Sequence, residues 1–170
     1  MIQKMIEQVI EFQKEFNLTK NDIPTEISQE EVKLRYDLFI EEYEEYLEGY
    51  EAEKKGLEYF TTKKGEYVNT FVYKVDAIID MLYIACGTIV THGYDFSDYE
   101  YQSEHWLSER NTIKSIKKVI KMYSNFDESN LENDVYIQML LDWILDLANH
   151  NDILDKLPEL FEEVQNSNMS

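Results

Sequence analysis

The stretch KVDAIIDMLYIACGT, residues 74–88, is apolar at most positions, yet it carries two carboxylates four residues apart, Asp76 and Asp80. Residues at this spacing lie on one face of an α-helix, one turn from each other. A helix that is apolar nearly all round is expected to be buried, and an unpaired charge in a buried helix is costly. The stretch therefore predicts a central core helix whose aspartates need a basic side chain, a proton or a metal ion.

The rest of the chain predicts an all-α helical bundle in a single domain, residues 1–170. The sequence holds only two prolines and five glycines, and few segments alternate as β-strands do. We expect the single Cys86, as well as Trp106 and Trp143, to pack in the core. Helices are expected near 2–17, 29–49, 66–92, 104–124, 131–149 and 153–166.

Composition limits the partners. The formal net charge is −19, from 35 acidic and 16 basic residues, and this charge repels nucleic acids. Residues 1–16 are amphipathic and acidic, so they do not resemble a signal sequence. The longest apolar region, residues 75–90, is short for a membrane span and is interrupted by Asp80. We therefore expect a cytoplasmic protein that binds neither nucleic acid nor membranes.

The expected helix at 29–49 carries a matching acidic pattern, because its inward stripe continues from apolar residues into Glu42 and Glu45. An antiparallel arrangement of the two helices lets these glutamates face Asp76 and Asp80. Four carboxylates around one cavity repel each other unless a cation neutralises them. Oxygen ligands without His or Cys favour Mg²⁺ first and then Mn²⁺. We predict these four residues as metal ligands.

Other interpretations of these residues stay open. In so acidic a chain, the EExxE pattern at residues 41–45 can arise by chance on a solvated face. Arg35 and Lys74 could pair with the aspartates in place of a metal. Gly87 lies inside the core helix, where glycine costs roughly 1 kcal/mol relative to alanine. Its presence predicts the close approach of a neighbour or ligand.

The combination of these patterns resembles a known superfamily. Arg35 followed by EExxE, and then DAxxDxLYxxxGT from Asp76, is similar to the all-α nucleoside triphosphate pyrophosphohydrolases, the MazG-like and phosphoribosyl-ATP pyrophosphatase-like group. The similarity is greatest to versions often encoded by phages. The segment FEEVQNSNMS, residues 161–170, also resembles the closing segment of that subgroup. The resemblance covers about 1–95 and 158–170 and leaves a helical insertion at about 97–157.

The resemblance implies an activity and roles for several residues. It implies Mg²⁺-dependent cleavage of a nucleoside triphosphate to the monophosphate and pyrophosphate, by a homodimer or dimer of dimers, in the host cytoplasm if the protein is phage-encoded. Glu41 would be the outer or water-activating carboxylate, beside Glu42 and Glu45 as ligands. The commoner motif places a glutamate where this chain has Ala77, one residue after Asp76. Residues assigned to substrate binding are Arg35, Lys74, Tyr83 and Asn168.

Two functions follow from the sequence. One is a metal-dependent nucleotide pyrophosphohydrolase. The other is a non-catalytic helical interaction or nucleotide-sequestering protein on the same scaffold, whose altered core-helix motif no longer supports turnover. No motif marks a preference for base or sugar.

The expected insertion contains an unusual basic stripe within SERNTIKSIKKVIKMY, residues 108–123. It lies opposite an isoleucine face at helical spacing. It is either a solvated face that offsets the surrounding acid, or a surface for phosphate or for self-association. The residues of the basic stripe are Arg110, Lys114, Lys117, Lys118 and Lys121.

Overall fold

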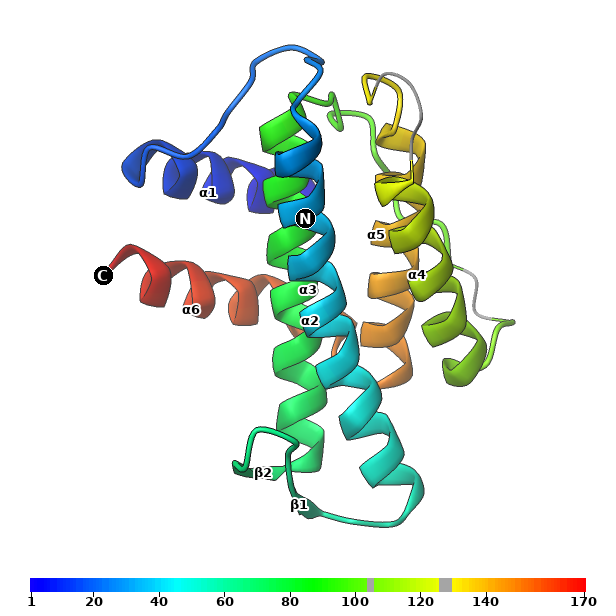
Figure 1. The fold of residues 1–170 in the computed structure, drawn as a ribbon. Helices are drawn as coiled ribbons and strands as arrows, with labels where there is room; N and C mark the ends of the chain where they lie inside the picture. Colours follow the sequence, from blue (N-terminus) through cyan, green and yellow to red (C-terminus); the bar gives the residue numbers. More distant parts are fainter. Residues whose placement is uncertain (104–105, 126–129) are drawn as a thin grey trace.

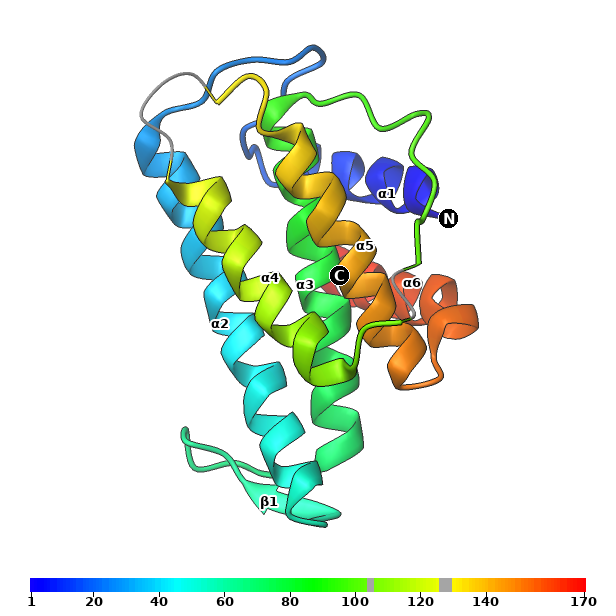
Figure 2. The same cartoon turned by 90° about the vertical axis from the view of Figure 1, so that its right-hand side faces the viewer.

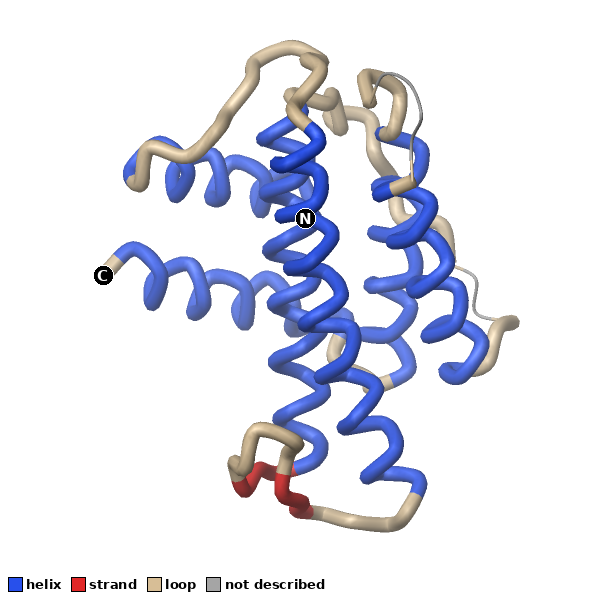
Figure 3. The backbone as a smooth tube through the Cα atoms, viewed as in Figure 1, coloured by secondary structure: helices blue, strands red, loops and turns tan. Residues whose placement is uncertain are grey.

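The computed structural model describes residues 1–103, 106–125 and 130–170. In this part of the chain, helices dominate and one short hairpin is present, so the predicted all-α helical bundle is confirmed (Figure 3). The elements are α1 (Ile2–Glu15), α2 (Gln29–Lys54), β1 (Tyr59–Thr61), β2 (Tyr67–Asn69), α3 (Thr70–His92), α4 (Glu109–Ser124), α5 (Asp134–His150), the 3₁₀ turn η1 (Leu154–Lys156) and α6 (Leu157–Met169).

Helices α2 and α3 run side by side as the long spine of the molecule (Figure 1). Each begins at a side-chain cap, because Ser28 Oγ accepts from the Glu31 amide at 3.2 Å and Asn69 Oδ1 accepts from the Val72 amide at 3.0 Å. Helix α3 ends at Gly93, whose φ of 75° is the left-handed conformation typical of helix C-termini. These caps set the residue at which each helix begins, and so the position of the acidic residues along it.

Helices α4 and α5 cover one side of the spine (Figure 2), α4 against α2 and α5 against α3. Their apolar stripes meet those of the spine in one core, in which Phe39, Leu82, Ile116 and Ile144 are fully buried. This antiparallel pair is the extra pair of helices that the sequence predicts in the C-terminal half.

Helices α1 and α6 lie on the other side and project from the spine as two neighbouring arms (Figure 1). A hydrogen bond of 2.7 Å from Gln165 Nε2 to the Gln8 carbonyl joins the arms. The β-hairpin lies below α6 on the same side, at the lower end of the spine (Figure 1).

Several expectations differ from the structure. Residues 66–69, expected to begin the core helix, lie in and beside β2 instead, and α3 starts at Thr70. The hairpin forms because Gly65 adopts a φ of 90° at its turn and the rings of Tyr59 and Tyr67 stack at 5.7 Å. Trp106, expected in the core, is 73% exposed, because it precedes α4 instead of lying within it.

Other expectations for single residues hold. Cys86 is fully buried, and Trp143 packs, partly buried, against the core. The start of the fourth helix near residue 104 lies outside the described residues, and α4 is described from Glu109.

Helix α3 is long and apolar enough to cross a membrane by length and composition, and it is the one such helix in the described ranges. However, 72% of its most apolar window is buried among the other helices. Burial of this kind is typical of the core helix of a soluble protein, so length and composition carry no argument for a membrane span.

Candidate functional site

The spine brings the predicted metal ligands together. Glu42 and Glu45 of α2 face Asp76 and Asp80 of α3, close enough for their charges to act on each other. Together with Glu41, these residues form what we call the acidic cluster. Its position on two antiparallel helices agrees with the arrangement that the sequence predicts.

The burial of the aspartates differs from the prediction. Asp76 is exposed and Asp80 is half-buried, so the expectation of two buried aspartates is wrong. Val72, one turn before Asp76, is 52% exposed, so the start of this face of α3 is open to solvent. The aspartates therefore need no buried cation for the fold to form.

Glu42 is the member of the acidic cluster whose charged form is least favoured. Its Oε2 atom is buried and has no hydrogen-bond partner among the described residues. Burial, and then the negative charge of Asp80, raise the pKa of Glu42 to about 9. This environment favours the protonated carboxyl group, whereas a nearby cation would favour the charged form.

The aspartates show the same surplus of negative charge. Burial, the charge of Asp76 and then that of Glu45 raise the pKa of Asp80 to about 6. Although Asp76 is exposed as a residue, partial burial of its carboxyl group and the charge of Glu45 raise its pKa also. Like charges with raised pKa values are typical of functional sites.

The hairpin supplies a cation that the sequence analysis missed. Lys64 Nζ lies 3.2 Å from Glu41 Oε1 and 3.4 Å from Glu45 Oε1, and these carboxylates raise the pKa of Lys64. The Lys63 amide donates to Glu48 Oε2 at 2.8 Å and so anchors the turn on α2. Gly65 between two runs of strand-forming residues was the available signal for this turn.

The carboxylate oxygens of the acidic cluster are ligands that suit a hard divalent cation. Oε2 of Glu42, which is buried without a hydrogen-bond partner among the described residues, is available as one of them. The side chains do not form a closed set, however. Among the described residues, no three Asp, Glu, His or Cys side chains are gathered as a group that could hold a metal ion. The residue types and charges thus fit a divalent ion, whereas the side-chain arrangement is open.

Arg35 of α2 and Gly87 of α3 meet two helical turns from the acidic cluster, along the line of contact between these helices, which we call the seam. A Cβ atom at Gly87 would lie 2.6 Å from Arg35 Nη1 and 3.0 Å from Gln13 Oε1. The close approach predicted for Gly87 is confirmed, and the neighbour is the guanidinium group. Burial lowers the pKa of Arg35, and electrostatic interactions with Tyr123 and Glu31 partly offset this lowering. No carboxylate of the acidic cluster forms an ion pair with Arg35 in the described part of the chain.

Tyr83 and Asn168 are brought together from distant parts of the sequence. Tyr83 lies one turn beyond Asp80 on α3, and its hydroxyl donates to Gln165 Oε1 of α6 at 2.7 Å. Burial raises the pKa of Tyr83, and a hydrogen bond with Asn168 opposes that effect. The ring stacks on Phe161 at 5.2 Å. Helix α6 thereby places Asn168 beside Tyr83, one turn along α3 from Asp80.

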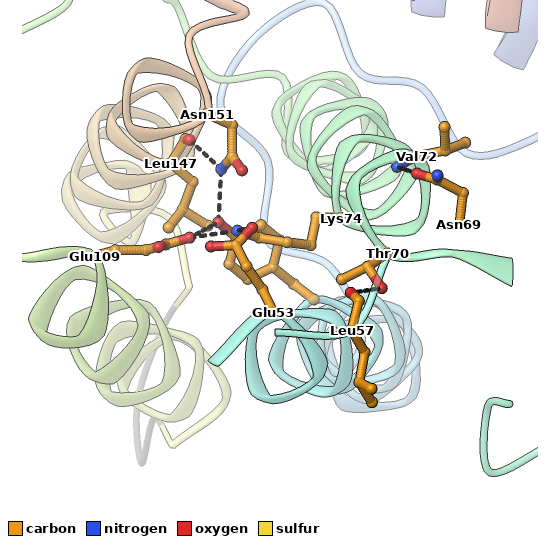
Figure 4. A network of polar contacts seen from close by, with 10 residues as sticks. Glu53, Leu57, Asn69, Thr70, Val72, Lys74, Glu109, Leu147 and Asn151 are labelled. Atoms are coloured by element: carbon orange, nitrogen blue, oxygen red, sulfur yellow. Dashed lines mark hydrogen bonds and ion pairs between the residues drawn. The ribbon is translucent and has the colours of Figure 1, made fainter. Parts of the chain in front are cut away.

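Lys74 does not join the acidic cluster. Its side chain is 1% exposed, and Nζ lies 2.8 Å from both Glu53 Oε2 and Glu109 Oε1 (Figure 4). The hydroxyl of Tyr46 donates to the same Glu109 oxygen at 2.6 Å and accepts from Asn151 Nδ2 at 2.7 Å. This network ties α2, α3 and α4 together, so Lys74 pairs with glutamates and not with the aspartates.

Comparison with known proteins gives one match. The family model for phosphoribosyl-ATP pyrophosphohydrolase matches residues 9–102, which include the whole acidic cluster and end before α4. The searches of curated proteins and of solved structures returned no match.

Proposed function

The chain belongs to the phosphoribosyl-ATP pyrophosphohydrolase family, and we propose that it is a metal-dependent nucleotide pyrophosphohydrolase that cleaves a (d)NTP or related nucleotide to the monophosphate and pyrophosphate. The family supports hydrolysis of a nucleotide to release pyrophosphate. The observation that supports the metal requirement is Glu42, whose buried Oε2 has no partner among the described residues and whose pKa is raised.

In this proposal Glu42, Glu45, Asp76 and Asp80 hold Mg²⁺, or Mn²⁺ in its place. An ion held there would supply positive charge to neutralise the phosphates and to polarise the phosphoryl group under attack. The raised pKa values of Glu42 and Asp80 then fall, since a nearby cation favours the charged form of a carboxyl group. The protein thus provides the carboxylates that would hold the ion before the substrate binds.

The remaining residues of the site orient water and substrate. Glu41 is exposed and accepts the proton of the attacking water. Lys64 holds Glu41 and Glu45 through ion pairs and is the cation nearest to them for contact with a phosphate. Tyr83 and Asn168 contact the nucleotide from the α6 end of the seam, and Arg35 contributes its positive charge from deeper in the spine.

A second function is favoured by two observations. No three carboxylates are gathered as a metal site among the described residues, and Ala77 stands where the commoner superfamily motif has a glutamate. A protein that binds and sequesters nucleotides without cleaving them is consistent with both.

Pyrophosphate release separates the two functions. The purified protein is incubated with each canonical and modified (d)NTP, and with phosphoribosyl-ATP, in Mg²⁺, in Mn²⁺ and in EDTA. The proposal expects equal amounts of monophosphate and pyrophosphate from at least one nucleotide, and none in EDTA. Binding of a nucleotide without any release would favour the sequestering protein.

We also propose that the protein is a homodimer or a dimer of dimers. Leu34 and Val72 are 55% and 52% exposed on the helices that carry the acidic cluster, so a second copy would cover apolar surface beside the site. Light scattering that gives a mass of at least twice 20.4 kDa at low micromolar concentration is expected. A monomer at all concentrations would contradict the proposal.

A further inference from the structure

A groove of about 1060 Å³ lies between α2 and α4, which Figure 2 shows side by side. Its cations are Lys54 of α2 and the whole basic stripe of α4. Its apolar lining comes from Leu47 and Ile113 and from the rings of Tyr43 and Tyr50. The groove thus combines a cationic rim with an apolar and aromatic wall.

This groove is separate from the acidic cluster. No member of the acidic cluster lines it. At 3.6 residues per turn, Tyr43, Leu47 and Tyr50 point to nearly the opposite side of α2 from Glu41 and Glu45. A ligand in the groove therefore has α2 between itself and the carboxylates.

Two carboxylates, Glu51 and Glu109, line the groove beside its six cations. None of the six forms an ion pair with a carboxylate of the described residues, whereas Lys20, Lys33, Lys64 and Lys74 each form at least one. Within the basic stripe, Lys114 and Lys118 are four residues apart, a spacing at which like charges destabilise a helix. An otherwise very acidic chain therefore keeps a repulsive cluster of positive charge beside a cavity, which an anionic ligand would relieve.

The lining indicates the class of anion. The volume suits a small organic molecule, and ammonium groups are common partners of phosphates. Lys117 lies 6.0 Å from the ring centroid of Tyr43 and Lys54 5.2 Å from that of Tyr50, so charge and aromatic surface adjoin at both ends. A nucleotide has the matching parts, a planar base for the apolar wall and phosphates for the rim.

We infer that the groove between α2 and α4 is a second nucleotide site, which binds a nucleoside polyphosphate through the basic stripe without a metal ion. The groove offers no free carboxylate pair for hydrolysis, because Glu109 is held by Lys74 and Tyr46, which leaves Glu51 as the one other carboxylate of its lining. The site therefore binds and does not cleave. This inference goes beyond the proposed function, because it concerns neither the acidic cluster nor turnover.

The test is ATP binding by calorimetry in EDTA, which leaves the acidic cluster without a metal and repulsive to phosphates. The expected result is one ATP per chain, bound about tenfold or more weakly by the Lys114→Gln/Lys118→Gln double variant. The matched control is Lys4→Gln/Lys14→Gln, which removes two exposed lysines of α1 and should leave affinity unchanged. Asp80→Asn should also bind ATP normally, so failure of the catalytic proposal does not imitate failure here.

Several results would overturn the inference. One is no ATP binding at millimolar concentration, and another is an equal loss of affinity in the α1 control. Inorganic triphosphate that binds as tightly as ATP would reject a nucleotide, and a single-stranded oligonucleotide that binds more tightly would point to nucleic acid. Dissociation of an oligomer by the Lys114→Gln/Lys118→Gln change, without ATP binding, would show that the groove seats a second copy.

Discussion

Oε2 of Glu42 on α2 is buried opposite the negative charge of Asp80 on α3, and burial first and this charge second raise the pKa of Glu42 to about 9. Burial, and then the charges of Asp76 and Glu45, raise the pKa of Asp80 to about 6. In the metal-free protein, the two helices therefore meet across carboxyl groups that favour protonation. This surplus of negative charge links the stability of the fold to pH and to cations.

The pH dependence follows in sign from these shifts. A carboxyl group whose pKa is higher in the folded state contributes stability at low pH, and that stability is lost as pH rises through the folded pKa. For Asp80 the interval is from 3.8 to about 6, and for Glu42 from 4.5 to about 9. In EDTA, urea denaturation should show the free energy of unfolding falling between pH 5 and 9, by on the order of 1–3 kcal/mol. Asp80→Asn should flatten this slope, and stability that rises over the interval would contradict the account.

Divalent cations should reverse the effect. Mg²⁺ or Mn²⁺ binds the folded acidic cluster in preference to the unfolded chain, and at 100 times Kd this preference is worth about 2.7 kcal/mol. The midpoint of thermal unfolding should rise by roughly 5–10 °C. The control is KCl at equal ionic strength, which should leave the midpoint nearly unchanged. No shift with either divalent ion at millimolar concentration would count against the metal site.

Lys74 should be a stability residue. Lys74→Met keeps an apolar stem of similar length but leaves Glu109 without its buried partner, and we expect a loss of about 3 kcal/mol in denaturant unfolding. Lys33→Met is the matched control, because Lys33 forms an exposed pair with Asp37 and should cost under about 1 kcal/mol. Unchanged stability together with a raised KM in Lys74→Met would instead support the substrate-binding role predicted from sequence.

Gly49 tests the packing of the same network. A Cβ atom there would lie 2.7 Å from Cγ of Lys74, whose ammonium group is held by two ion pairs. Gly49→Ala should therefore lower stability by about 1 kcal/mol, even though alanine favours a helix by a similar amount. The control is the same change in a Lys74→Ala background, where the clash is gone and alanine should stabilise. Destabilisation in both backgrounds would reject this explanation.

The sequence predicts the helices well because their apolar spacing is local information. It also pairs Glu42 and Glu45 with Asp76 and Asp80, since a connection of moderate length allows the two helices to lie antiparallel. The hairpin between them is missed because its strands have three residues each, too few for a visible alternation. Lys64, at its turn, is missed with it.

Two other differences have a tertiary origin. The apolar pattern of α3 does not show which of its faces receives a neighbour, so Asp76 is exposed where burial was expected. Lys74 finds Glu53 and Glu109 at sequence separations of 21 and 35 residues. No periodic pattern connects partners so far apart, so the sequence does not show that Lys74 pairs with them.

The most direct test of the central claim is pyrophosphate release by Asp80→Asn in Mg²⁺, with the nucleotide that the wild-type protein cleaves. Because the change keeps the volume and removes a repelling charge, the metal-free variant should be at least as stable as the wild type, while its turnover falls by on the order of 10²-fold or more. Asp37→Asn, an exposed change on α2, should retain full turnover. Wild-type turnover in Asp80→Asn would contradict the account, as would release of pyrophosphate in EDTA.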